Sequence, residues 1–489
     1  MNSHKSKIFA IIAVIALIAY PASAGVRLEG FYENVNYFDG TLKWYMAEPH
    51  NNFELRLYAN PINNVEAFLK FHGESDKYLN NNPADRYTIY DMLEAHVKYR
   101  WDKGAEVVLF ARENRFWFSQ GLMELVSQWT VNDGGNAQGA RVDFWNLWKI
   151  YGTAIHSDYS QSGGEDANIL RWNLPLFSDR FRLSSTLARK DWTGSSDNWN
   201  SVVAADAYFS LGRTVPFLKK FGDIGCAGEI AKSRIPGESD TAQNLAYRAE
   251  LRNLRIAGLE MKFAYRNAQE NFRSYLSNDF DAGQKYNEEG FNIQASYFFP
   301  TKAINLTTSY DQYAAPLTRN FPVSATNPAR TYRESYNELY VEFIHDIRFK
   351  TYCKYYRGWD TNYDDYRTYP TCFGELSFEN FLAKVRLQYK WKDFGTPYEL
   401  RAFGIELNAN ISKNWKLYLR AMNVDEIAES RQTAFVQLQY LGWSSTDFFI
   451  EFGDPNDSND DLTNDDSFVN YSANQEIKLQ LKTYLRVYF

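Results

Sequence analysis

The sequence contains few of the residues that build metal centres and disulfide scaffolds. Of its 489 residues, three are cysteine and six are histidine. Three cysteines are too few for a disulfide-stapled fold, although Cys353 and Cys372 lie on either side of one loop and are candidates for pairing. The chain has no CxxC pair, Gly-rich phosphate loop, haem-attachment motif or metal-binding histidine spacing. We therefore expect no enzyme activity, no cofactor and no resident metal.

Long apolar runs are also scarce, and the one that exists lies at the start of the chain. Two lysines precede an apolar stretch over residues 8–20, and a small-residue site that ends at Ala24 follows it. This stretch falls short of the roughly 20 residues that a membrane-spanning helix needs. The order basic, apolar, small is that of a secretory signal peptide. We predict cleavage of residues 1–24, which leaves residues 25–489 as one domain.

The charge balance excludes a basic nucleic-acid surface. The formal net charge is −7, and removal of the two lysines with residues 1–24 makes it −9. The mean hydropathy of −0.51 suits a soluble protein, but it equally suits a barrel in which only alternate residues meet lipid. The aromatic content of 17% favours the barrel, because membrane barrels carry aromatic girdles at both interfaces.

The clearest pattern is the alternation over the last residues, 476–489. Apolar side chains at Leu485, Val487 and Phe489 alternate with polar ones at Lys482 and Arg486. A period of two predicts a strand with one apolar and one polar face. A strand of this kind that ends on phenylalanine resembles the assembly signal of bacterial outer-membrane proteins. The resemblance implies insertion by the barrel-assembly machinery with the help of periplasmic chaperones.

The same alternation recurs in short segments after Gly25, and no stretch sustains a helical period. Tight turns, such as residues 412–414, alternate with long polar loops, such as residues 268–289, which we expect to face outward. This order is typical of transmembrane barrels. Some segments, residues 201–211 among them, are weakly patterned. We predict an all-β fold, a large antiparallel transmembrane β-barrel with an even number of about 18–24 strands. A barrel of this width encloses an aqueous passage.

The most distinctive stretch is residues 110–144, where a charged strand end runs into a loop with several large apolar residues. An apolar cluster in a loop needs a surface to pack on. Infolding into the barrel creates a pore constriction, whereas packing on the rim or on another subunit does not, and both interpretations stay open. The constriction candidates are Arg112, Glu113, Arg115, Arg141 and Asp143. The order of charged strand end, aromatic loop and the strand at residues 139–143 resembles alginate-export-type channels and implies a channel of unspecified solute.

Inward positions in the last third of the chain lean basic. The predicted basic wall of the lumen consists of Lys350, Lys384, Arg386, Lys416, Arg420, Lys482 and Arg486. Because the chain as a whole is acidic, its negative charge must lie elsewhere, above all in the last loop. Four carboxylates there, Asp454, Asp457, Asp460 and Asp461, are a weak calcium candidate without EF-hand spacing, and a solvated acidic loop is the simpler interpretation.

These patterns together predict a porin-like channel of the cell outer membrane for small hydrophilic solutes, with a preference for anions or saccharides. The partners we expect are outer-membrane lipid and lipopolysaccharide, and further copies of the chain in a homo-oligomer. Two alternatives share the barrel signature: a dedicated exporter or secretion-complex barrel with a plugged or gated lumen, and a barrel enzyme or adhesin. A soluble all-β secreted protein fits less well, because it requires neither the terminal phenylalanine nor the alternating loop lengths.

Overall fold

The structure is a computed structural model, which describes most of the chain after Ala24. The described residues are 25–38, 44–45, 51–78, 86–102, 104–111, 120–127, 131, 137–147, 149–158, 165–192, 198–238, 243–277, 288–299, 303–314, 331–344, 346–360, 365–397, 399–426, 430–453 and 480–489. Over these ranges, no helix has the length and apolar character needed to cross a bilayer.

The described residues are nearly all in β-strands. The strands are β1 (Gly25–Phe38), β2 (Trp44–Tyr45), β3 (Asn51–Ile62), β4 (Val65–Tyr78), β5 (Arg86–Trp101), β6 (Ala105–Ala111), β7 (Gln138–Leu147), β8 (Ile150–Asp158), β9 (Glu165–Leu176), β10 (Phe181–Trp192), β11 (Trp199–Ser210), β12 (Gly225–Arg234), β13 (Leu245–Ile256), β14 (Leu259–Ala268), β15 (Glu288–Phe298), β16 (Ile304–Ala314), β17 (Thr331–Ile344), β18 (Ile347–Asp360), β19 (Asp365–Glu379), β20 (Ala383–Lys392), β21 (Leu400–Ser412), β22 (Trp415–Glu426), β23 (Ser430–Tyr440), β24 (Thr446–Gly453) and β25 (Gln480–Tyr488). Two short helices, α3 (Leu211–Thr214) and η3 (Pro216–Phe221), connect β11 to β12.

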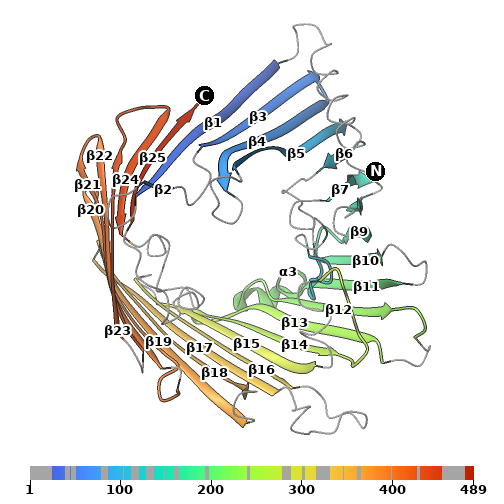
Figure 1. Cartoon of the computed structure of the whole chain (residues 1–489). Coiled ribbons are helices and arrows are strands. Elements are labelled where there is room, and N and C mark those ends of the chain that lie inside the picture. The colour runs from blue at the N-terminus through green and yellow to red at the C-terminus, as the bar shows by residue number, and fades with distance from the viewer. Residues whose placement is uncertain are drawn as a thin grey trace.

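The sheet closes on itself into a barrel (Figure 1). From β3 onward each strand pairs antiparallel with the next, and β1 closes the ring by pairing with both β3 and β25. The two-residue β2 pairs only with the end of β1 among the described strands, so the ring itself has 24 of the 25 strands. The predicted all-β class, antiparallel closure and even strand number are confirmed.

Alternate residues of each strand face opposite sides of the barrel wall. In β21, for example, Ala402 and Glu406 are buried on the inner face, whereas Phe403 and Ile405 are more than 40% exposed on the outer face. The outer face is apolar and the inner face is largely polar, because a strand with period two separates its two sets of side chains. This inverts the arrangement of a water-soluble sheet protein, whose apolar face is covered.

The connections alternate in length around the ring. Both ends of the barrel chain, Gly25 and Phe489, lie at the end with the short connections, which we call the short-turn end. The turn at Ala257 and Gly258 is of this kind, and both residues have the positive φ that a tight hairpin requires. The helices α3 and η3 form the longest connection at the short-turn end. The opposite end carries the long loops.

Two of the three cysteines form a disulfide on the outer face of the wall. Cys353 of β18 and Cys372 of β19 stand directly opposite one another in the register, with their Cα atoms 4.2 Å apart. Cys226 of β12 is free. The pairing that the loop spacing suggested is therefore present in the structure.

Candidate functional site: the lumen of the barrel

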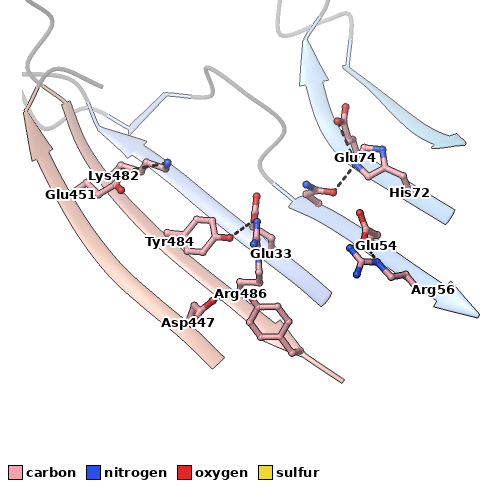
Figure 2. Close-up of polar contacts among 12 residues, drawn as sticks. Glu33, Glu54, Arg56, His72, Glu74, Asp447, Glu451, Lys482, Tyr484 and Arg486 are labelled. Carbon is pink, nitrogen blue, oxygen red and sulfur yellow. Dashed lines mark hydrogen bonds and ion pairs between the residues drawn. The ribbon is translucent and has the colours of Figure 1, made fainter. Parts of the chain in front are cut away.

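Closure of the barrel joins a set of charged and tyrosine side chains on the inner face of β25 and β1 (Figure 2). Arg486 Nε donates a hydrogen bond to Glu33 Oε2 at 2.9 Å, and the Tyr484 hydroxyl donates to the same oxygen at 2.5 Å. The Arg486 guanidinium also lies over the ring of Phe31, 4.4 Å from its centre. The first and last strands thus share a charge-assisted network as well as a backbone ladder.

Further ion pairs flank the seam on both sides. On β24, Glu451 Oε2 lies 3.3 Å from Nζ of Lys482. On β3, Glu54 Oε1 lies 2.6 Å from the Arg56 guanidinium (Figure 2). In these pairs the base is the more exposed partner: the side chain of Arg56 is 38% exposed and that of Glu54 is 9% exposed. The carboxylates lie against the wall, and the cationic groups cover them.

The predicted basic wall occupies the inner face of β18, β20, β22 and β25, where the register places all seven of its residues. Lys350 Nζ is 3.2 Å from Glu338 Oε2. Arg386 Nε donates to Glu406 Oε1 at 3.0 Å, and its second nitrogen bonds the other oxygen of that carboxylate. Here too the base is more exposed than the acid, because the Arg386 side chain is 21% exposed and that of Glu406 is 9% exposed.

Bases outnumber acids on this part of the inner face. The bases are Arg348, Lys350, Lys354, Arg367, Lys384, Arg386, Lys390, Lys392, Lys416, Arg420, Lys482 and Arg486. The acids are Glu334, Glu338, Glu342, Glu375, Glu379, Glu406, Asp447 and Glu451. The charge pattern along β17–β25 therefore gives the described wall a positive excess.

An apolar cluster interrupts the basic wall. Tyr352 and Phe373 stack with ring centres 5.1 Å apart, and Leu400 and Met422 belong to the same cluster. All four are at most 7% exposed. Because the aromatic faces are covered, they do not form an open stacking surface for sugar rings.

Two segments from the long-loop end fold into the barrel against β6–β14. We call residues 120–127 and 269–277 together the inner layer. Met123 and Leu125 of the first segment pack with Phe272 of the second, and Val126 packs in a cluster with Leu276. Ser127 N–H donates to the Leu276 carbonyl at 2.5 Å, which joins the two segments. The described part of the first loop, residues 120–127, therefore folds into the barrel. The second segment had been expected in an outward loop, and its first residues instead turn inward.

The wall beneath the inner layer is made of small residues. Ala204, Ala231, Ala246 and Ala268 follow one another in direct register across β11–β14. Each is at most 2% exposed, and all four share a cluster with Met123. A row of methyl groups leaves a shallow groove in the wall, and the larger side chains of the inner layer fill it.

Polar groups of the wall fix the backbone of the inner layer. Glu229 of β12 is 4% exposed and accepts a hydrogen bond from the Met123 N–H at 2.6 Å. Asn200 of β11 accepts from the Tyr275 N–H at 3.2 Å and donates to the Arg273 carbonyl at 3.3 Å. These groups satisfy a chain segment that has no strand partner of its own. Sequence reasoning missed both of them, although the acidic Glu229 among small residues in β12 is the signal that marks the site.

The predicted constriction is only partly within the described residues. Arg112, Glu113 and Arg115 lie outside them. Arg141 and Asp143 lie on the inner face of β7, where Arg141 Nε donates to Asp143 Oδ2 at 2.8 Å. Asp143 Oδ1 also accepts from the Thr153 hydroxyl at 2.6 Å. Arg141 is 8% exposed and the Asp143 side chain is 25% exposed, so the acid is the partner that faces the lumen.

The other predicted sites are the assembly signal at the end of β25 and the acidic loop before it. Val487 and Leu485 lie on the outer face of β25, and Phe489 exchanges two backbone hydrogen bonds with Gly30 of β1 at 3.0 and 3.1 Å. The acidic residues Asp454, Asp457, Asp460 and Asp461 lie outside the described residues. Over the part of the chain that the structure describes, no group of three or more His, Cys, Asp or Glu side chains is arranged to hold a metal ion.

These features define a class by architecture: a closed antiparallel β-barrel with a charged interior that two infolded segments narrow. No protein-family model matches the sequence, and no curated protein does. The fold resembles the P pilus usher (PapC) translocation pore, with a TM-score of 0.48 and 10% identity over 94% of this chain and 99% of that one. It also resembles the siderophore receptor PirA from Pseudomonas aeruginosa (TM-score 0.44, 8% identity, 95% and 80% covered) and Acinetobacter baumannii OccAB2 (0.37, 11%, 95% and 98%). Likenesses this distant do not indicate a solute.

Proposed function

We propose that this chain is an outer-membrane channel that lets small hydrophilic solutes pass and prefers anions. A ring of 24 strands is too wide for its own side chains to fill, so a water-filled passage remains beside the inner layer. In such a passage a polar solute keeps its hydration, which avoids the several kcal/mol per unsatisfied group that the bilayer core imposes. No chemical step is required.

The observation that carries the anion preference is the excess of bases over acids on the inner face of β17–β25. The basic partner is the more exposed one at Arg56, Arg386 and Arg486. At these three pairs a solute meets the guanidinium group before the carboxylate, whereas in the pairs Arg141–Asp143 and Lys354–Glu334 the acid is the more exposed partner. The basic excess along β17–β25 produces a positive potential inside a protein whose net charge is negative.

Planar-bilayer recording of the refolded barrel tests this proposal. We expect steady single-channel conductance, and in a KCl gradient we expect a reversal potential of the sign that chloride preference produces. The double variant Lys350→Gln/Lys384→Gln removes two charges whose side chains are 36% and 40% exposed, and we expect it to shift the reversal potential toward cation preference.

The matched control is Arg401→Gln, which removes one charge from the outer face of β21. It leaves the inner face intact, so we expect the reversal potential of the unmodified barrel. Cation selectivity of the unmodified barrel, or an equal shift in the control, contradicts the anion preference. Anionic oligosaccharides as current blockers then test whether the likeness of residues 110–144 to alginate-export-type channels extends to the solute.

A dedicated exporter with a gated lumen is the second candidate, and the inner layer favours it. Two segments held by an alanine groove and by buried polar groups form a structure that a partner protein is able to displace. A folded barrel without conductance, which opens after displacement of the inner layer, supports the exporter over the open channel.

We also propose an outer-membrane location and the partners that this location implies. The apolar outer face suits outer-membrane lipid, with lipopolysaccharide around the long-loop end. Assembly is expected to depend on the barrel-assembly machinery and periplasmic chaperones. A homo-oligomer and the absence of enzyme activity stay predictions.

A further inference from the structure

A cluster of three bases around one carboxylate lies on the inner face of β13 and β14, between the inner layer and the short-turn end. Arg248 lies 2.6 Å from Glu250, Arg252 bonds the same carboxylate, and Lys262 Nζ lies 3.7 Å from it. The Glu250 side chain is 1% exposed, whereas those of the three bases are 22%, 37% and 32% exposed. The single acid is covered, and the bases face the lumen.

One carboxylate cannot satisfy three bases. A guanidinium has five N–H donors and an ammonium has three, whereas Glu250 has two oxygens. Nε of Arg248 is buried and makes no hydrogen bond. The cluster therefore has spare donors and more positive than negative charge.

Two neighbouring acids lower this charge without cancelling it. Glu229 stands opposite Arg248 in the register and accepts the Met123 N–H of the inner layer. Glu260, nearer the short-turn end, is paired with Arg255 at 2.7 Å. With both acids counted, four bases (Arg248, Arg252, Arg255 and Lys262) lie beside three acids (Glu229, Glu250 and Glu260).

A cavity of about 360 Å³ opens beside the cluster. Arg252, Lys262 and the acidic Glu260 line it from one side, and Gln294 and Ser296 of β15 line it with neutral polar groups. Lys262 and Gln294 are direct cross-strand partners, so the charged and neutral donors lie close together. The volume lies in the range of small-molecule sites and exceeds what a single ion needs.

We propose that this cavity is a binding site for small solutes that carry a phosphate or carboxylate group. Two bases supply charge-assisted hydrogen bonds to the oxyanion, and Gln294 and Ser296 contact the remainder of the solute. The inference deepens the proposed function, on which it rests for its role in transport, because it places an anion-selective step at the short-turn end of the passage.

Isothermal titration of the full-length refolded barrel with inorganic phosphate and with a small dicarboxylate, malonate, tests the site, with glucose as the neutral comparison. We expect binding of both anions and none of glucose. Loss of one charge-assisted contact is expected to weaken binding about ten-fold in Arg252→Gln and in Lys262→Gln. Lys262→Arg keeps the charge and is expected to retain most of the affinity.

Arg213→Gln is the matched control, because it removes one charge at the same end of the barrel from α3, outside the cavity. Retained heat-modifiable migration in gels shows that each variant is folded. Equal weakening in the control, or unchanged binding in both cavity variants, overturns the site.

Conductance recorded on the same samples separates the two proposals. Anion binding in a barrel that conducts nothing retains the site and rejects the open channel. Anion-selective conductance without anion binding retains the channel and rejects the site.

Discussion

Truncation of Met123 is expected to release the inner layer while the barrel stays closed. Met123 is 1% exposed and packs on the alanine row of β11–β14, whereas the backbone ladder of those strands does not involve it. Met123→Ala therefore acts on the contact between the layer and the wall and leaves the wall itself unchanged.

The size of the effect follows from the burial. Replacing a buried methionine by alanine costs about 2–5 kcal/mol. Since 1.4 kcal/mol corresponds to a factor of ten, the ratio of docked to undocked inner layer falls by roughly 30-fold or more. The Met123 N–H bond to Glu229 is retained by the variant, so this figure concerns side-chain packing alone.

Limited trypsin digestion measures the change at the bond after Arg273. In the docked layer the Arg273 N–H donates to Ser233 Oγ at 3.0 Å and the segment lies against the wall. We expect cleavage at this bond to accelerate by roughly the same 30-fold when opening and closing are fast relative to cleavage. Single-channel traces are expected to show more frequent current steps.

Leu109→Ala is the control, because Leu109 is 44% exposed on the outer face of β6 and does not touch the layer. Its cleavage rate and current traces should match those of the unmodified protein. If Met123→Ala folds normally and also shows an unchanged cleavage rate, the inner layer is not held by this packing.

Three further predictions concern the seam, the disulfide and the salt dependence. Glu33→Gln removes the anionic acceptor of Arg486 and Tyr484, and we expect the free energy of unfolding in urea to fall by about 1–3 kcal/mol; an unchanged midpoint contradicts the role of the seam network. Cys353→Ser opens a disulfide that spans 19 residues of sequence, and the loss expected from chain entropy is about 3 kcal/mol in the same assay, with Cys226→Ser as the silent control. Anion selectivity should decline between 0.1 and 1 M salt, because the screening length falls from about 10 to about 3 Å; selectivity that is independent of salt points to size selection.

The weakly patterned segment at residues 201–211 shows why the number of strands was hard to predict. This segment is β11, and its inner face carries Val202 and Ala204, where other strands carry charged residues. The polar half of the alternation is interrupted at Val202 and Ala204, because the inner layer, and not water, covers that part of the face. The alternation along a strand reflects what covers each of its faces, and here a distant part of the chain covers the inner face of β11.

For the charged residues, the sequence predicts which side of the wall they face but not which partners they meet. Inward placement of Lys350, Arg386 and Arg486 follows from the parity of their strands, and the structure has them there. Their partners do not follow from parity: Arg486 meets Glu33 only because the last strand pairs with the first. Two of the predicted constriction residues, Arg141 and Asp143, form an ion pair on the wall, and Asp143 is the more exposed of the two.

The class of fold and the two faces of each strand were predictable from local pattern, because side-chain alternation is a property of residues adjacent in the chain. Tertiary structure decided the closure at 24 strands, the ion pairs across the seam and the inner layer. Met123 and Glu229 are 106 residues apart, and only the closed ring places the backbone of one on the carboxylate of the other. Contacts of that kind depend on the curvature and register of the whole sheet, which no local pattern contains.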